Sequence, residues 1–170
     1  MIVDTEILKS IPNSEDQTCF GCGARNPHGL KMKFLTDGRR VVSFMQVPPT
    51  MTGWDRTVHG GILSTILDEI MGWSVICLLK KIGVTRSMAV EFKKPVNAGE
   101  RLTIIGGVQE KQSERSSLMT AAIYNADEVP CVEAKGRFTT MQPKAAVRLG
   151  LVGGDYMQAF GPVLNFSYDQ

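Results

Sequence analysis

The chain has 170 residues, 43% hydrophobic and 21% charged, so it is long and apolar enough to form one domain with an ordinary core. Its formal net charge of +2 is too small to indicate a protein that binds a polyanion, which argues against a nucleic-acid partner. The 17 glycines and 8 scattered prolines favour turn-rich β structure over a helical bundle, and four cysteines do not make a disulfide scaffold in a chain of this length.

The first ten residues carry Asp4 and Glu6 and lack the basic and apolar segments of a secretory signal, so we expect a cytoplasmic protein. The longest apolar run, Ile62 to Leu79, has the length of a membrane span. It contains Asp68 and Glu69, and each carboxylate costs about 2.5 to 3.5 kcal/mol to insert into a bilayer. We therefore predict a buried helix of a globular domain and no membrane span.

The first third of the chain predicts a lead-in followed by a hairpin. Residues 1–18 are weakly helical or irregular, and glycines make a tight turn of Cys19 to Gly23. Apolar residues then alternate with lysines from Leu30 to Phe34, which predicts a half-buried strand. Asp37-Gly38 is typical of a hairpin turn, and Val41 to Val47 is the expected return strand.

The remainder predicts one long helix and then β structure. The helical period begins at Gly60 or Gly61 and runs to Lys80, with Gly83 expected to close the segment. Two strands, a helix and further strands indicate an α+β layer architecture. Residues 143–170 match no strong template and are expected to be a tail or a partner-packing arm. The four later strands are expected at Arg86 to Lys94, Arg101 to Glu110, Arg115 to Asn125 and Val129 to Met141.

The predicted helix has two unlike faces. At about 100° per residue, one broad face is apolar, and the opposite arc is short-chained and polar. That arc is either an ordinary surface stripe or a narrow polar site into which one carboxylate projects. Surface stripes usually carry long charged side chains, so we favour the site. The apolar face comprises Ile62, Leu63, Ile66, Leu67, Ile70, Met71, Cys77 and Leu78, and the arc comprises Gly61, Ser64, Thr65, Asp68, Glu69 and Gly72.

The helix begins at His59-Gly60-Gly61, where the first backbone amides have no intrahelical acceptor. Glycines let a substrate oxygen approach those amides, which lie at the positive end of the helix dipole and can stabilise an oxyanion. The glycine pair could also simply start the helix, and His59 could be a core histidine. The presence of Asp68 on the same helix favours the catalytic interpretation.

The spacing between these groups predicts an oligomer. Asp68 lies roughly 10 to 12 Å along the helix axis from the amides of Gly60 and Gly61, so one chain cannot bring both to one carbonyl. If they act together, two helices pack antiparallel about a two-fold axis and form two equivalent sites. We expect an obligate homodimer, or a tetramer built as a dimer of dimers.

Two motifs resemble the PaaI-like branch of the hotdog-fold acyl-CoA thioesterases, within the 4-hydroxybenzoyl-CoA thioesterase superfamily. They are His59-Gly-Gly-Ile-Leu-Ser-Thr-Ile-Leu-Asp68-Glu69 and Val90-Glu-Phe-Lys-Lys-Pro95-Val-Asn-Ala-Gly99. The leader Cys19-Phe-Gly-Cys22-Gly with Asn26-Pro-His-Gly-Leu30 is also similar to bacterial members and to a mitochondrial branch. The resemblance covers about residues 19–142 and implies an antiparallel sheet of about five to six strands wrapped around one long central helix.

The resemblance also assigns roles. Asp68 corresponds to the catalytic carboxylate, as general base or nucleophile, and Gly60 to the amide that polarises the thioester carbonyl from the other subunit. Thr85, ten residues before Pro95, falls where relatives hold the attacking water. Some relatives have an amide side chain six residues before the histidine, where this chain has Gly53. Trp54, Asp55 and Arg56 are the neighbours that could compensate.

Thioester hydrolysis needs an activated water, an oxyanion donor and an acyl slot, and we expect neither a metal nor a redox cofactor. Coenzyme A would be part of the substrate, and its phosphates need cations near the site. The expected catalytic residues are Asp68, Gly60, His59 and Thr85. The residues expected to line the substrate site are Gly61, Ser64, Glu69, Lys94 and Pro95, although Glu69 also suits a structural role. Further candidate cations for the phosphates are Lys93, Arg101 and Arg115.

Other interpretations stay open. Cys19-x-x-Cys22 has the spacing of a zinc site but lacks two ligands unless His28 or a partner chain supplies them. A hotdog hydratase or dehydratase would need a histidine and acid pair, and only His28 and His59 are present. A non-enzymatic acyl-CoA-binding dimer would leave the Asp68 carboxylate without a task. The acyl group and the choice between dimer and tetramer are not fixed by the sequence.

Overall fold

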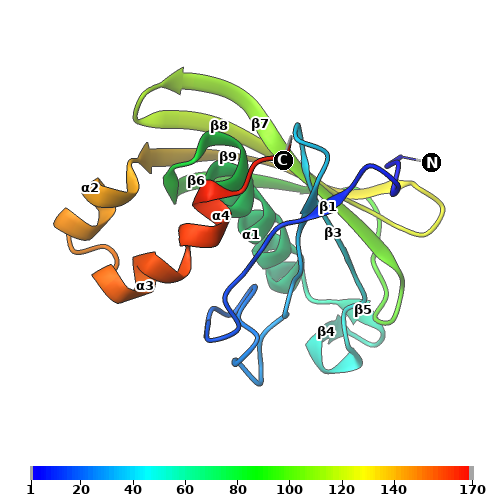
Figure 1. Ribbon diagram of the computed structural model, residues 1–170. Coiled ribbons are helices and arrows are strands. Elements are labelled where there is room, and N and C mark those ends of the chain that lie inside the picture. The colour runs from blue at the N-terminus through cyan, green and yellow to red at the C-terminus, as the bar shows by residue number, and fades with distance from the viewer. Residues whose placement is uncertain (1, 169–170) are drawn as a thin grey trace.

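The structure, a computed structural model, describes residues 2–168 and consists of one curved antiparallel sheet around one long helix (Figure 1). The sheet order is β1-β2-β3-β7-β8-β9-β6, and β4 and β5 form a separate ribbon. The strands are β1 Lys9–Ser10, β2 Leu35–Thr36, β3 Val41–Met45, β4 Thr52–Trp54, β5 Thr57–Val58, β6 Ile82–Phe92, β7 Leu102–Ser113, β8 Ser116–Tyr124 and β9 Pro130–Met141; the helices are α1 Gly60–Leu79, α2 Pro143–Arg148, α3 Gly154–Ala159 and α4 Gly161–Asn165, with a 3-10 turn at Pro49–Met51.

The apolar face of α1 supplies the centre of the core. Each fully buried aliphatic side chain contributes about 1.5 to 3 kcal/mol, so this face is the main force that holds the sheet on the helix. The same helix is long and apolar enough to cross a membrane, but half of its most apolar window is buried inside the domain. The buried residues of α1 are Leu63, Ile66, Leu67, Ile70, Met71, Trp73, Ser74, Val75 and Cys77.

The predicted strand from Leu30 to Phe34 is wrong, and regular pairing is confined to β2. Met32 and Phe34 are buried as expected, but Lys31 has a φ of 53°, which an extended strand cannot contain. The backbone here bonds to loops instead: Leu30 N–H donates to the Phe20 carbonyl at 2.8 Å, and Met32 N–H to the Gly21 carbonyl at 2.9 Å.

The end of α1 also differs from the expectation. The helix stops at Leu79, and Lys80 adopts the left-handed conformation with a φ of 55° while its N–H donates to the Ile76 carbonyl. Gly83 does not close the helix but lies within β6, which starts four positions before the predicted Arg86. A lysine therefore performs the capping that the sequence assigned to glycine.

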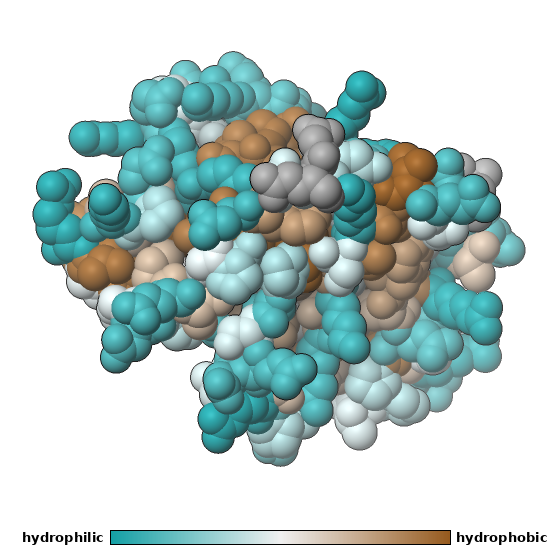
Figure 2. All heavy atoms as spheres, in the orientation of Figure 1, coloured by the Kyte–Doolittle hydropathy of each residue, from teal (hydrophilic) through white to brown (hydrophobic). Residues whose placement is uncertain are grey.

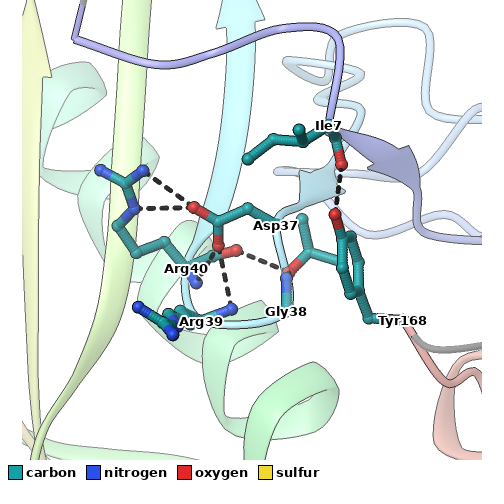
Figure 3. Close-up of polar contacts among 7 residues, drawn as sticks. Ile7, Asp37, Gly38, Arg39, Arg40 and Tyr168 are labelled. Atoms are coloured by element: carbon teal, nitrogen blue, oxygen red, sulfur yellow. Dashed lines mark hydrogen bonds and ion pairs between the residues drawn. The ribbon is translucent and has the colours of Figure 1, made fainter.

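The turn between β2 and β3 packs against Tyr168, which in turn bonds to the N-terminal lead-in (Figure 3). Asp37 accepts hydrogen bonds from the N–H groups of Arg39 and Arg40 and from the Arg40 guanidinium at 2.7 to 3.0 Å. The ring of Tyr168 packs over Gly38, whose φ of 84° suits glycine. The Tyr168 hydroxyl donates to the Ile7 carbonyl at 2.8 Å, so the C-terminal segment is fastened to the N-terminal lead-in.

Residues 143–165, for which the sequence offered no template, form three short helices, of which α4 lies against α1 while α2 and α3 extend away from it (Figure 1). Phe160 packs against Trp73 of α1, and the Lys80 ammonium donates to the carbonyls of Val163 and Phe166. Figure 2 shows hydrophobic side chains gathered at the left over α2 and the loop that follows it, where Leu149 and Leu151 are exposed.

Candidate active site

Asp68 and Thr85 form a hydrogen-bonded pair between α1 and β6. The Thr85 hydroxyl donates to Asp68 Oδ1 at 2.7 Å, so one carboxylate oxygen is fixed in place. The register of β6 against β9 shifts between Thr85 and Ser87, and a bulge of this kind redirects a side chain out of the regular alternation. Thr85 is exposed and Asp68 half-buried, so the pair is open to solvent in the single chain.

The start of α1 presents one free backbone amide. His59 is the N-cap, and its Nδ1 accepts the N–H of Gly61 at 2.9 Å. Within residues 2–168 the Gly60 N–H donates to no acceptor. The two glycine amides therefore differ: the Gly61 N–H already donates to His59, whereas the Gly60 N–H is available to an incoming oxygen.

The turn after β6 lies beside this helix start. Val58 N–H donates to the Val96 carbonyl at 2.8 Å, and Ala98 N–H to the Arg56 carbonyl at 2.8 Å. Lys94 and Pro95 directly precede these contacts and therefore lie near β5, the strand that leads into His59. The ring of Phe92 lies about 3.4 Å from where a Gly60 Cβ would be, a neighbour that sequence reasoning missed.

The two parts of the predicted site lie at different heights on α1. Eight residues separate Gly60 from Asp68, or about 12 Å along the axis. Between them, the hydroxyls of Ser64 and Thr65 donate to the carbonyls of Gly60 and Gly61 at 2.9 Å, so these side chains lie flat on the helix. One chain holds a free backbone amide and a carboxylate but does not bring them together.

Gly53 packs directly against His59. A Cβ at this position would lie 3.2 Å from His59 Cδ2 and 3.3 Å from its Cα, so a larger side chain would have to displace the histidine. The neighbouring Trp54 is 85% exposed, and Asp55 and Arg56 are exposed as well. Within residues 2–168 none of the three makes a polar side-chain contact that would replace the missing amide.

Glu69 belongs to a different group from Asp68. The Trp73 indole N–H donates to Glu69 Oε1 at 3.1 Å, and Cys19 Sγ lies 3.7 Å from both carboxylate oxygens. Burial of this carboxyl raises its pKa to about 7 despite the hydrogen bonds from Cys22 and Trp73 that oppose the shift. The spacing from Glu69 to Trp73, one helical turn, was the sequence signal that could have shown this pairing.

A groove of about 690 Å³ opens beside His59. Its walls come from the loop after Cys19 and from the turn before β4, and both histidines of the chain line it. Sequence reasoning missed this groove because its walls are irregular loops. The lining residues include Phe20, His28, Gly29, Met51, His59 and Ile62.

The candidate phosphate-binding cations differ in availability. The Lys93 ammonium is engaged with Glu133 at 2.6 Å and Glu91 at 3.8 Å. Lys94, Arg101 and Arg115 are exposed, and none of them forms an ion pair within the described part of the chain. Of the three, Lys94 lies nearest in sequence to Phe92 and the Gly60 amide.

The model of the thioesterase superfamily matches residues 56–132, a stretch that contains His59, Gly60, Asp68, Thr85 and Lys94. Over this stretch the chain is similar to the thioesterase superfamily, and its sheet wrapped on one long helix is the hotdog fold. An uncharacterised mitochondrial protein of Candida albicans (strain WO-1) is 27% identical to the chain over 108 residues. This match takes in 61% of the present chain but only 48% of the relative, so the chain spans about half the length of that protein.

Solved thioesterase structures share the fold of this hotdog domain. The thioesterase superfamily protein RHA08564 has a TM-score of 0.66 at 23% identity, over 72% of this chain and 60% of its own. A hypothetical thioesterase from Streptococcus pneumoniae, solved with coenzyme A, has a TM-score of 0.57 at 25% identity, over 61% and 82%. The E. coli PaaI protein has a TM-score of 0.59 at 20% identity, over 66% and 80%. The predicted hotdog architecture is confirmed.

Proposed function

We propose that this chain hydrolyses acyl-CoA thioesters in a homodimer. The observation that carries the proposal is the Thr85 to Asp68 hydrogen bond of 2.7 Å, which fixes a carboxylate on the polar arc of the core helix. A solvent-accessible acid with one oxygen held and the other free is suited to accept a proton from water. The S. pneumoniae thioesterase solved with coenzyme A supports the choice of substrate class.

In the proposed reaction Asp68 takes a proton from water while the water oxygen attacks the thioester carbon. The Gly60 N–H of the partner helix donates to the carbonyl oxygen as negative charge develops there. The carbon–sulfur bond then breaks, the coenzyme A thiolate takes up the proton that Asp68 removed from water, and the free acid leaves with the Asp68 carboxylate restored. Thr85 keeps the carboxylate oriented toward the water.

The proposed dimer follows from the gap between the two groups and from the free edge of the sheet. Asp68 and Gly60 of one chain are about 12 Å apart along α1, so a second, antiparallel α1 is needed to complete a site. β6 is the last strand of the sheet, and within residues 2–168 its outer edge pairs with no strand. Val84 and Phe92 on this strand are exposed, as expected of a surface that a second copy covers.

Release of free thiol from a panel of aromatic and aliphatic acyl-CoAs tests the activity. Asp68→Asn keeps the shape of the side chain and should lower kcat/KM by about 100-fold or more. Asp127→Asn, in the exposed loop between β8 and β9, is the matched control and should leave the rate unchanged.

Any of three other outcomes would reject the proposal. Full activity of Asp68→Asn removes the carboxylate from the mechanism. Hydration of an enoyl-CoA without thiol release assigns the chain to the hydratase class. Acyl-CoA binding without turnover identifies a binding protein.

A further inference from the structure

The loop Cys19–Gly23 brings two thiols to the carboxylate of Glu69. The two Sγ atoms and one carboxylate oxygen lie within 4.8 Å of one another, and Cys19 Sγ is 3.7 Å from each oxygen. Cys22 is only 6% exposed, and Cys19 and Glu69 are half-buried. The proposed hydrolysis uses none of these groups.

The loop is shaped around this cluster. A Cβ on Gly21 would lie 2.4 Å from the Glu69 carboxyl carbon, and a Cβ on Gly23 would lie 2.5 Å from the Cys19 nitrogen, so neither position accepts a side chain without rearrangement. Gly23 N–H donates to the Cys19 carbonyl at 2.9 Å, which closes the turn between the two cysteines. The loop therefore approaches Glu69 as closely as its backbone allows.

The cluster places two thiols and a carboxylate, all of which can become anionic, together with few positive charges or hydrogen-bond donors to stabilise them. The one nitrogen donor on the Glu69 carboxylate among residues 2–168 is the Trp73 indole, and no lysine, arginine or histidine in that range forms an ion pair with it. A buried carboxylate beside two thiols is costly unless a cation or further donors neutralise it. The arrangement suits a bound cation better than an empty cluster.

The distances match tetrahedral zinc. With Zn–S of about 2.3 Å and Zn–O of about 2.0 Å, a tetrahedral ion separates a sulfur from an oxygen ligand by about 3.5 Å and two sulfurs by about 3.8 Å. The observed 3.7 Å between Cys19 Sγ and the carboxylate is within about 0.2 Å of that value. Two thiolates favour zinc over oxygen-seeking cations such as magnesium.

We propose that Cys19, Cys22 and Glu69 bind one Zn²⁺ ion per chain, with the fourth position open to water. Each thiol that coordinates the ion releases its proton to solvent. The sequence analysis considered His28 or a partner chain as further ligands, but the fold brings Glu69 to the two cysteines instead, because the loop lies against α1. The ion would fasten this loop, which also forms a wall of the groove beside His59, to the core helix.

The test uses the full chain, purified with a reductant and stripped with a chelator. Zn²⁺ titrated against a chromophoric chelator should bind in a 1:1 ratio, and Co²⁺ should show the thiolate-to-metal charge-transfer absorption of sulfur ligation. Cys22→Ser and Glu69→Gln should each weaken Zn²⁺ binding by about 100-fold or more, because loss of a ligand exceeds the 10- to 100-fold cost of losing a supporting contact. Cys131→Ala, which alters a buried cysteine of β9 outside the cluster, should bind Zn²⁺ like the unaltered chain.

Glu69→Gln keeps an oxygen acceptor for Trp73, so it separates metal binding from folding if Cys22→Ser fails to fold. In the unaltered chain Zn²⁺, and not Mg²⁺, should raise the thermal midpoint, and Glu69→Gln should abolish the rise. Absence of stoichiometric Zn²⁺ binding would overturn the proposal, as would equal affinity in Glu69→Gln. A Cys19–Cys22 disulfide that persists in the reduced, chelator-treated protein would overturn it too.

Discussion

Replacing Gly60 by proline removes the backbone N–H that the proposed mechanism needs and should leave the fold intact. Gly60 is the first residue of α1, and its N–H has no acceptor within residues 2–168, so the substitution breaks no hydrogen bond there. His59 has a φ of −60° and a ψ of 133°, the extended conformation that a residue before proline requires. Proline is also favoured at the first helical position.

The size of the expected effects follows from this geometry. A Cβ at Gly60 would lie 3.4 Å from Phe92 Cζ, an ordinary van der Waals contact. Stability should therefore stay equal or rise by about 0.4 to 1 kcal/mol, because proline restricts the unfolded chain. If the Gly60 N–H is the oxyanion donor, kcat should fall by about 100- to 1,000-fold. Gly60→Ala adds the same Cβ but keeps the amide, so it should lose far less.

Thiol-release kinetics test whether the Gly60 amide is the oxyanion donor, and chemical denaturation checks that each variant is folded. Retention of kcat by a folded Gly60→Pro chain would refute the role of this amide, and so would an equal loss in Gly60→Ala. Co-expression with Asp68→Asn tests the shared site. In a mixed dimer one site carries both wild-type groups, so random pairing should restore about a quarter of full activity. No recovery in a population shown to contain mixed dimers would place the site within one chain.

Three further substitutions test individual contacts. Thr85→Val removes the hydrogen bond to Asp68 and should lower kcat about tenfold, whereas Thr85→Ser should retain most of it in the same assay. Asp37 is held ionised: burial raises its pKa, but the hydrogen bonds from Arg39 and Arg40 outweigh burial and lower the pKa overall. Because this pKa lies below the unfolded value of about 3.9, ionised Asp37 stabilises the fold above that pH, and the stabilisation is lost as the pH falls through the folded pKa. Asp37→Asn should therefore lower the free energy of unfolding by about 1 to 2 kcal/mol at neutral pH. In urea unfolding the stability of the variant should depend less on acid pH, and the difference from the unaltered chain should vanish below the folded pKa. Lys80→Met removes the donors to Val163 and Phe166, and amide hydrogen exchange in α4 should accelerate while exchange in the middle of α1 does not change.

The regular elements were predictable because their residues face a uniform environment. The apolar face of α1 repeats with the helical period, and β7 to β9 alternate between core and exterior, so a single sequence sufficed to locate them. The family resemblance singled out Thr85 as a residue that holds the attacking water, but its hydrogen bond to Asp68 was not predicted. What the alternation could not show was the bulge after Thr85 that turns its hydroxyl toward α1.

The irregular segments were not predictable because their backbone bonds go to partners far along the chain. Leu30 to Phe34 has the alternation of a strand, yet the conformation of Lys31 and the bonds to Phe20 and Gly21 make it the partner of a loop. Lys80 replaced glycine as the helix cap because its ammonium also binds the C-terminal segment. In each case a tertiary contact outweighed a local preference of about 1 kcal/mol.

The same reasoning explains why two adjacent acids on α1 have different fates. Asp68 and Glu69 are about 100° apart on the helix, which is enough to direct one toward β6 and the other toward the Cys19 loop. The hydroxyl of Thr85 leaves Asp68 open to solvent, whereas Trp73 and the cysteine loop enclose Glu69. Substitution of Glu69 should therefore alter metal affinity, and substitution of Asp68 turnover. A Glu69→Gln chain that binds no Zn²⁺ but retains kcat would demonstrate that the core helix supports two independent sites.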